Sequence, residues 1–346
     1  MEFLKRQKFL FEEEVKNGIC PDDGIRFYDF SKRWMEEYGK KNLAVKTYTR
    51  YEGFLVRINQ AIGHIKLRDL KPLQLNAFYR NLGEDGVNQK TKGKLAPKTI
   101  LEHHRLISKI LNTAIKWQLL ETNVAMRADP PKVPHKERAY LDDVQTKQML
   151  SLLENEPMQY KTMISFLVYT GLRRGELCGL EWKDINFDNG MLRVVRSSQY
   201  IGNQTMQTKE PKTKSGIREF TLNPSACRLL RDYKEWQNEQ KNKVGDKWNE
   251  TDRLFTTWDG KPIHPDTITD WFSKFIKRSG LPYVTLHSLR HTNATLMIAV
   301  GTDVCTVSKR LGHADVSTTL NIYSHALKSK DTEAAEKLES AFRIAV

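Results

Sequence analysis

Cysteine is scarce in this 346-residue chain, and its four cysteines lie far apart in the sequence. They form no C-x-x-C pair, which argues against a zinc ribbon and against a disulfide framework. Long apolar runs are also lacking. The longest, around residues 163–172, is far shorter than the roughly 20 residues that cross a bilayer. Residues 1–18 mix Lys, Arg and Glu with apolar residues and lack the apolar core of a secretory signal. These absences predict a cytoplasmic protein with no membrane contact.

Acidic residues are in deficit: 42 Asp and Glu stand against 56 Lys and Arg, so the formal net charge is +14. This surplus makes nucleic acid the leading partner, because Lys and Arg that neutralise phosphates release counterions. A basic but otherwise ordinary enzyme is the alternative that charge leaves open. Clustered Asp and Glu are lacking near the polar motifs described below, which argues against a metal-dependent nuclease.

A proline-rich segment, residues 128–135, divides the chain into two parts. Its three prolines favour extended backbone, which suits a linker between domains. Before it, apolar and aromatic residues recur at helical spacing over 27–38, 45–62 and 97–119, which predicts three helices with a buried stripe. We interpret the basic segment 88–94 as a solvated loop, with a loop that touches phosphates as the alternative.

After the linker the pattern is mixed. Three short segments, 191–200, 205–209 and 216–222, predict strands joined by turns. Helices are predicted on both sides of them, at 142–153, 160–169, 224–241, 265–278, 287–300, 303–311 and 331–342. The predicted fold class is therefore mainly α with a small antiparallel sheet (α+β), in which a helical domain precedes a helical domain with a three-stranded sheet.

Four polar segments next to predicted turns offer phosphate ligands or a nucleophile. Metal-free transfer of a phosphodiester needs guanidinium groups, which stay charged and bind phosphate oxygens in pairs. It also needs a nucleophile that forms a covalent intermediate, and an acid that protonates the leaving oxygen. Two Arg, one Lys, two His and one Tyr would meet these needs. The segments are 170–176, 211–216, 286–291, and 311–313 followed by Tyr323.

Each of these residues also has a structural alternative. Arg173 and Arg174 follow a glycine where a helix begins, and either could simply pair with Glu176. His287 and His291 are one helical turn apart, as in a metal site, but acidic neighbours and an H-E-x-x-H motif are lacking. The lysines of the second segment can be solvated charges at a hairpin turn, and the tyrosine can be an ordinary aromatic.

In their order and spacing the segments resemble the tyrosine recombinase (phage integrase) family. The catalytic domain of that family carries T-G-x-R, K, H-x-x-R, G-H and Y in this order. Here the motifs are Thr170-Gly-Leu-Arg173, Lys212, His287-Ser-Leu-Arg290, Leu311-Gly-His313 and Thr318-Thr-Leu-Asn-Ile-Tyr323. The helical first domain is similar to the family's core-binding domain, although its residues are less distinctive.

The resemblance implies a division of the chain into five parts. Residues 21–127 would be a helical, SAM-like core-binding domain and residues 139–326 the tyrosine recombinase catalytic domain, joined by the linker 128–138. Residues 327–346 would form a C-terminal helix for subunit exchange. Residues 1–20 would be an N-terminal helix or linker, either all that precedes the core-binding domain or a remnant of an arm-binding region.

The resemblance also implies roles for the motif residues. Tyr323 would be the nucleophile that forms a 3′-phosphotyrosyl link and releases a 5′ hydroxyl. Arg173 and Arg290 would hold the nonbridging oxygens of the scissile phosphate. Arg173 is chosen over Arg174 because it is the arginine that aligns with T-G-x-R. Glu176 would be a supporting residue that orients the arginines.

Lys212 would be the general acid for the leaving 5′ oxygen, with Lys214 as the alternative because the family hairpin varies in length. His287 and His313 would bind the phosphate by hydrogen bonds, and His287 would also help to deprotonate Tyr323. Such help is needed because the ordinary pKa of tyrosine is about 10. The resemblance implies neither a metal nor any other cofactor.

The implied partners are double-stranded DNA core sites, a homotetramer on DNA, and a DNA-bending protein and an excisionase. An apolar stripe in the C-terminal segment is interpreted as a surface that docks on a neighbouring subunit, with packing on its own domain as the alternative. The stripe comprises Ala334, Ala335, Leu338, Ala341, Phe342 and Ala345. Two other functions stay open: a type IB topoisomerase and a DNA-binding regulator with an inert site.

Overall fold

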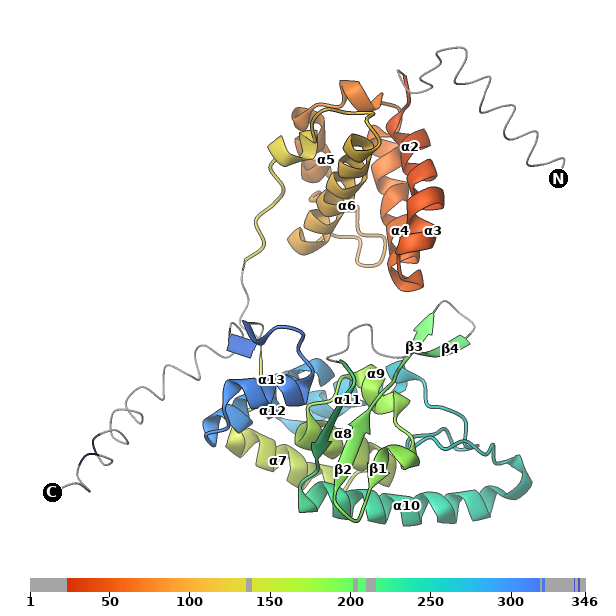
Figure 1. Cartoon of the computed structure of the whole chain (residues 1–346), viewed down its shortest axis with the longest axis vertical. Helices are drawn as coiled ribbons and strands as arrows, with labels where there is room; N and C mark the ends of the chain where they lie inside the picture. Colours follow the sequence, from red (N-terminus) through yellow and green to blue (C-terminus); the bar gives the residue numbers. More distant parts are fainter. Residues whose placement is uncertain are drawn as a thin grey trace. The chain divides into compact units, whose positions relative to one another are not determined.

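The structure is a computed structural model that describes residues 24–134, 139–201, 205–209, 216–317, 319–320, 339 and 342. The chain divides into two compact units, Met1–Lys136 and Glu137–Val346 (Figure 1). Within the described ranges, none of the helices combines the length and the apolar character that a membrane span needs.

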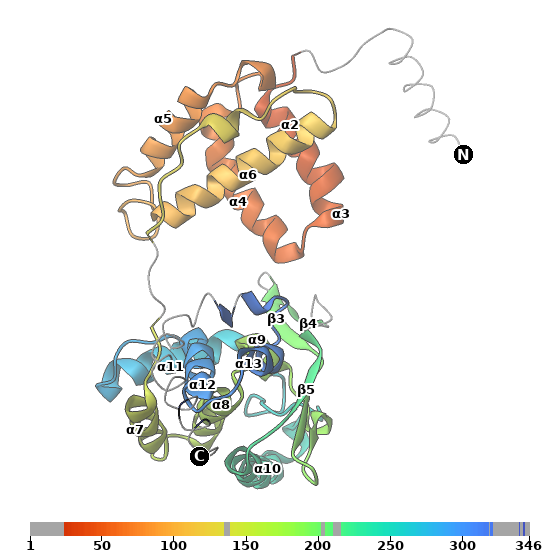
Figure 2. The ribbon, with the colours of Figure 1, turned by 60° about the vertical axis from the view of Figure 1, so that its left-hand side comes forward.

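The first unit is a bundle of helices (Figures 1 and 2). Its largest buried side chain, Trp34, is fully covered, and the indole Nε1 donates to Thr113 Oγ1 at 2.9 Å. A buried tryptophan with a partner for its N–H fixes both packing and orientation. The helices are α2 (Phe27–Trp34), which continues through the π-helical turn η1 (Met35–Gly39) into α3 (Lys40–Asn42), α4 (Val45–Ile62), α5 (Pro72–Leu82) and α6 (Pro97–Lys116).

The predicted helices of this unit are confirmed, with small differences at their ends. The 45–62 helix has the predicted bounds, and the aromatic stripe of 27–38 lies in the core. The third helix ends at Lys116, three residues early, because Gln118 adopts a left-handed backbone with φ of +61°. The sequence did not indicate α5. Segment 88–94 is a loop, which the Asn88 side chain closes by accepting two backbone N–H groups.

The second unit is built around α8 (Met158–Thr170), which packs against helices on several sides. Nearly all of its middle residues are buried, which is typical of a helix inside a core. Figure 2 shows the other helices around it. They are α7 (Asp143–Leu153), α9 (Arg174–Gly179), α10 (Pro224–Val244), α11 (Pro265–Ser279), α12 (Leu286–Ala299) and α13 (Val304–Leu311). All but α9 match predicted helices to within a few residues. The predicted helix 331–342 lies outside the described residues, apart from Glu339 and Phe342.

The strands form two small antiparallel sheets, not the single sheet of three strands that we expected. One sheet has the order β1 (Ile185–Asn186), β2 (Met191–Val194), β5 (Arg218–Thr221). The other pairs β3 (Ser197–Ile201) with β4 (Thr205–Lys209). The predicted strand 191–200 is therefore divided after Val194, where pairing with β5 ends, and resumes at Ser197, where pairing with β4 begins. In the residues that the structure describes, β4 and β5 belong to different sheets and do not pair with each other.

Gly171 ends α8 and lets the chain turn directly into the segment that carries the site. Its φ is +64°, and a Cβ placed on it would lie 2.6 Å from Asn293 Oδ1 and 2.6 Å from Leu311 Cδ2. Glycine is required here for two reasons: the left-handed backbone, and the close approach of α12 and α13.

We expect Gly171→Ala to lower the free energy of unfolding by about 2–5 kcal/mol, as the sum of left-handed strain and overpacking. Gly280→Ala is the matched control, since Gly280 also ends a helix with φ of +72° but has open space around it. It should cost only the strain, about 1–2 kcal/mol. Urea unfolding followed by tryptophan fluorescence measures both. Equal losses would show that the contacts of Gly171 do not matter.

Candidate active site

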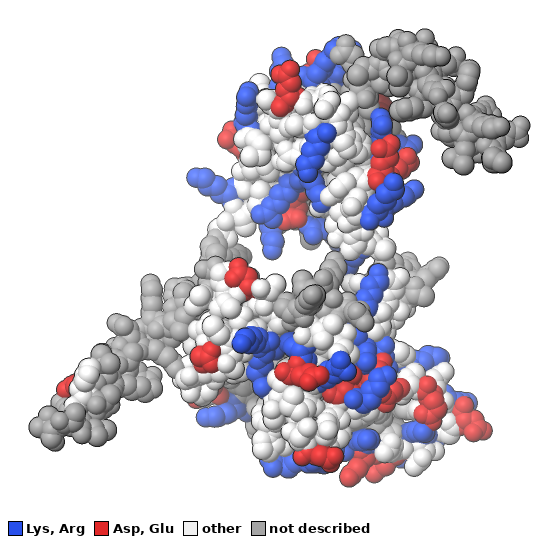
Figure 3. All heavy atoms as spheres, in the orientation of Figure 1, with Lys and Arg blue, Asp and Glu red and all other residues white. Residues whose placement is uncertain are grey.

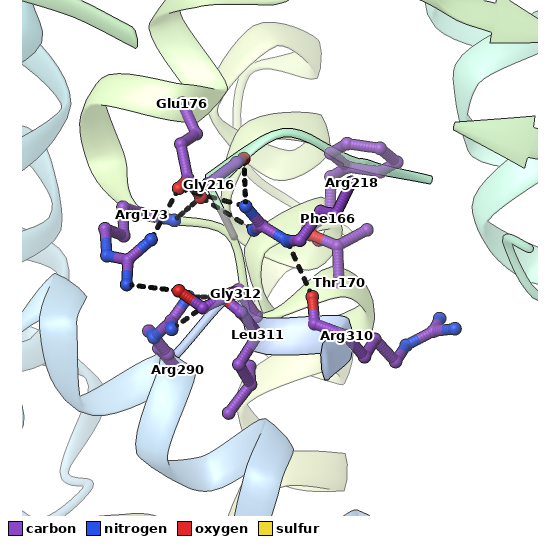
Figure 4. Close-up of polar contacts among 11 residues, drawn as sticks. Phe166, Thr170, Arg173, Glu176, Gly216, Arg218, Arg290, Arg310, Leu311 and Gly312 are labelled. Carbon is purple, nitrogen blue, oxygen red and sulfur yellow. Dashed lines mark hydrogen bonds and ion pairs between the residues drawn. The ribbon is translucent and has the colours of Figure 1, made fainter. Parts of the chain in front are cut away.

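Four segments of the second unit converge at the C-terminal end of α8 (Figure 4). Arg290, on α12, is the residue that joins them. Its Nη1 donates to Gly171 O at 2.9 Å, and its Nη2 donates to Leu311 O at 2.7 Å. The side chain is 3% exposed, so two backbone carbonyls at the ends of α8 and α13 hold a buried guanidinium in one orientation.

Arg173 is the N-cap residue of α9 and lies beside Arg290 (Figure 4). Its Nη1 donates to Glu176 Oε1 at 2.7 Å, and its Nη2 donates to Gly312 O at 3.1 Å. The side chain is 42% exposed, so this guanidinium is fixed at its inner edge and open to a ligand. Gly312 follows Leu311, so the two arginines hold successive carbonyls of one loop.

Glu176 is a buried carboxylate between two arginines. Arg173 donates to it from one side, and the Nη2 of Arg218 donates to Oε2 at 2.9 Å from the other. Burial by itself raises the pKa of Glu176, but the hydrogen bonds and charge of Arg218, together with Arg173, lower it further than burial raises it. Its net pKa lies below the ordinary value, so Glu176 is ionised at neutral pH.

Arg218 is a site residue that the sequence analysis missed. Its side chain is 6% exposed, and its Nε also donates to Arg310 O at 2.7 Å. It therefore ties β5 to the end of α13 as well as to Glu176. Inward-facing and outward-facing residues alternate along β5, which places Arg218 on the same face as Phe220. That alternation, with an arginine at an inward position, was the signal that would have predicted a buried carboxylate partner.

Arg173 and Arg174, which spacing could not separate, point to different partners. Arg174 donates from Nη1 to Asp266 Oδ1 at 2.6 Å and to Thr269 Oγ1 at 2.7 Å, both on α11. It is thus engaged in holding α9 against α11, whereas Arg173 lies in the cluster with Glu176.

The predicted histidines lie at the edge of the same cluster. His287 is exposed in the first turn of α12, three residues before Arg290. Its ring lies edge-on to the ring of His291, with 4.9 Å between the ring centroids. His313 follows Gly312 directly, is half-buried, and its Nδ1 is 2.7 Å from Thr319 Oγ1. In the ranges that the structure describes, no group of three or more His, Cys, Asp or Glu could hold a metal ion.

The remaining predicted residues, Lys212, its alternative Lys214, and Tyr323, lie outside the described residues. The described part of the cluster offers two fixed guanidiniums and two imidazoles at one end of α8. Such groups can bind and stabilise an anion with several oxygens, and they need no rearrangement to do so.

Two family models match the chain. "Phage integrase family" matches residues 139–330, more than half of the chain, and "Phage integrase, N-terminal SAM-like domain" matches residues 26–83. Among curated proteins, a "Tyrosine recombinase XerC-like" of Caldanaerobacter subterraneus is 28% identical over 98% of this chain and 88% of its own length. The "ICEBs1 integrase" of Bacillus subtilis is 30% identical over 77% of this chain and 70% of its own length.

Solved structures show the same fold. The Tn1549 transposon integrase, in complex with transposon right end DNA, superposes with a TM-score of 0.75 at 21% identity over 91% of this chain and 99% of that chain. A lambda integrase dimer bound to a COC′ core site has a TM-score of 0.65 at 18% identity, over 89% and 80%. The predicted fold class is confirmed. On the strength of the family match, the chain belongs to the phage integrase family of tyrosine recombinases, enzymes that transfer DNA strands at specific sites.

Proposed function

We propose that this recombinase integrates and excises a mobile element by cutting and rejoining core sites through Tyr323. The observation that carries the proposal is the cluster at the end of α8, where Arg173 and Arg290 are both fixed by the loop that ends at His313. Tyr323 follows ten residues later in the chain. The names of two relatives, the ICEBs1 integrase and the Tn1549 transposon integrase, support the assignment to a mobile element.

The first chemical step would be attack of the Tyr323 oxygen on the scissile phosphorus. A bond forms between phosphorus and the tyrosine oxygen, and the bond to the 5′ oxygen breaks, which leaves a 3′-phosphotyrosyl link. Charge grows on the nonbridging oxygens, where Arg173 and Arg290 would stabilise it. His287 and His313 would add hydrogen bonds, and His287 would accept the phenol proton. The covalent link conserves the energy of the phosphodiester, so the strand can be rejoined without a cofactor.

The leaving 5′ oxygen would take its proton from Lys212, with Lys214 as the alternative. Both lie between β4 and β5, in the segment that connects the two small sheets. The 5′ hydroxyl then attacks the phosphotyrosine of a partner strand, and the same groups act in reverse.

Residues 21–127 would bind DNA as the core-binding domain, residues 128–138 would link the two domains, and residues 139–326 would carry the chemistry. On the face drawn in Figure 3, Lys and Arg are plentiful on the first unit and Asp and Glu are fewer. This fits contact with phosphates, which the net charge of +14 also favours.

Assembly on DNA would be tetrameric. One chain of a lambda integrase tetramer bound to a Holliday junction superposes on this chain with a TM-score of 0.61, so the two chains share a fold. Residues 327–346 would dock on the next subunit through their apolar stripe, and such a head-to-tail contact can close into a ring. A DNA-bending protein and an excisionase would set the direction of the reaction.

Tyr323→Phe should lower covalent DNA cleavage by at least about 1,000-fold, because it removes the attacking oxygen and nothing else. Binding to a core site should be nearly unchanged, since affinity comes from many phosphate contacts. Suicide-substrate gels and mobility shifts measure the two properties. The matched control is Tyr160→Phe, at the far end of α8, where the ring stacks on Trp271 at 4.5 Å. Full adduct formation by the Tyr323 variant would contradict the proposal.

Lys212→Ala should slow cleavage about 10²–10⁴-fold, the usual effect of losing a general acid. A 5′-bridging phosphorothiolate at the scissile position should restore the rate, because a sulfur leaving group has little need of a proton. Single-turnover cleavage of both substrates measures this. If Lys212→Ala is not rescued while Lys214→Ala is, the acid role belongs to Lys214.

Glu176→Gln should lower the free energy of unfolding by about 3–5 kcal/mol at neutral pH, because it leaves two arginines without their carboxylate. Folding lowers the pKa of Glu176, so its charge stabilises the fold at pH values above about 4.5, the pKa of the carboxyl in the unfolded chain. This stabilisation is lost as the pH falls through the pKa of the folded state. The difference in the free energy of unfolding between the wild type and Glu176→Gln should therefore become smaller at acidic pH. Glu219→Gln, which removes an exposed partner of Arg193, is the control and should cost under about 1 kcal/mol. A difference that does not change with pH would contradict the role of the charge.

A further inference from the structure

Arg253 lies between α10 and α11 and links two elements that the reaction depends on. Its Nη1 donates to Gly179 O at 2.7 Å, at the end of the helix that begins beside Arg173. Its Nη2 donates to Thr208 Oγ1 at 2.8 Å, on β4. The Arg253 side chain is 12% exposed; its hydrogen bond to Gly179 is partly buried, whereas its hydrogen bond to Thr208 lies at the surface.

The pair of strands β3 and β4 is seated on α9 by close packing. A Cβ on Gly175 would lie 2.5 Å from Ser197 Oγ, and one on Gly179 would lie 3.2 Å from Ser198 N. Glycine at these two positions lets β3 lie directly against the helix backbone. Ser198 Oγ is in turn 2.9 Å from Thr208 Oγ1. The hydroxyl of Thr208 on β4 is therefore hydrogen-bonded both to Ser198 on β3 and to Arg253.

An acidic group, Glu181, also lies close to the guanidinium of Arg253. Glu181 Oε1 is 3.8 Å from Nη1, and the backbones of Glu181 and Arg253 form an isolated antiparallel bridge. Glu181 also binds Arg196 at 2.8 Å. A planar guanidinium fixed in this way donates in set directions, which a flexible lysine would not do.

We infer that Arg253 is a positioning residue for the general acid of strand transfer. Thr208 lies four residues before Lys212 in the chain, and β4 ends at Lys209. By holding Thr208 to the end of α9, Arg253 fixes β4, the strand that precedes Lys212 in the sequence, relative to the helix that Arg173 caps. A general acid works only within hydrogen-bond reach of the leaving oxygen, and a displacement of about 1 Å can cost about 100-fold. This inference rests on the proposed role of the lysine in the 210–215 segment.

The test compares two substrates in single-turnover cleavage: an ordinary suicide DNA site, and the same site with a 5′-bridging phosphorothiolate. Arg253→Met should slow the ordinary substrate about 10- to 100-fold and the phosphorothiolate less than about twofold, because only the ordinary substrate needs the acid. Thr208→Val keeps a β-branched residue in the strand and removes the hydroxyl that binds Arg253 and Ser198, so it should show the same selective defect. The double variant should be no slower than the slower single variant.

Arg193→Met is the matched control, because Arg193 lies on β2 in an exposed pair with Glu219, and it should leave both rates unchanged. Thermal unfolding and core-site binding of each variant report on folding. If Thr208→Val folds and slows both substrates equally, or slows neither, the inference is overturned. Lys212→Ala, measured in parallel, tests the proposed function separately. If the phosphorothiolate restores its cleavage rate, Lys212 is the general acid. If it does not, but Arg253→Met still slows only the ordinary substrate, the general acid is another residue of the 210–215 segment.

Discussion

A single buried carboxylate organises the catalytic unit of this recombinase. Glu176 accepts hydrogen bonds from Arg173 at the start of α9 and from Arg218 on β5, so one side chain fixes a helix, a strand and a site residue together. The same Arg218 donates to the backbone at the end of α13, which extends the network to the loop that carries His313. An ion pair in water would contribute little, but a buried carboxylate must be satisfied for the unit to fold. Glu176 accepts from four groups: the backbone N–H and Nη1 of Arg173, and Nη1 and Nη2 of Arg218. The shape of the site thus follows from a folding requirement.

The second arginine is held by different means. Arg290 donates to the backbone carbonyls of Gly171 and Leu311, which lie at helix ends. Helix C-termini leave carbonyls without partners inside the helix, and the left-handed Gly171 and Gly312 turn the chain so that they face Arg290. The two guanidiniums therefore share the carbonyls of the loop after α13, at Gly312 and Leu311, and each has a second acceptor of its own: Glu176 for Arg173 and Gly171 O for Arg290. Both are in place before substrate binds, which is how charge in a transition state is stabilised at least cost.

Much of this could be predicted from the sequence, because the signals are local. Apolar spacing gave the helix 45–62 to the residue, and Asp142 and Asp303 cap α7 and α13 beside the predicted starts. The motif order led to the family, and the structure brings Arg173, Glu176 and Arg290 to one place. The errors came from contacts between segments that are far apart in the sequence. The segment 191–200 pairs with β5 over β2 and with β4 over β3, and Arg218 was missed because its partner lies 42 residues away. Backbone acceptors such as Gly171 O leave no trace in a sequence at all.

The central claim is that Tyr323 attacks the scissile phosphate in a site whose positive charge comes from side chains alone. The most direct measurement is to incubate the protein with a suicide DNA site in excess EDTA, digest the covalent adduct, and locate the bound nucleotide by mass spectrometry. The account predicts a full yield of adduct in EDTA, with the nucleotide on the peptide that contains Tyr323. A nucleotide on another residue, or cleavage that needs Mg²⁺ while DNA binding does not, would contradict it.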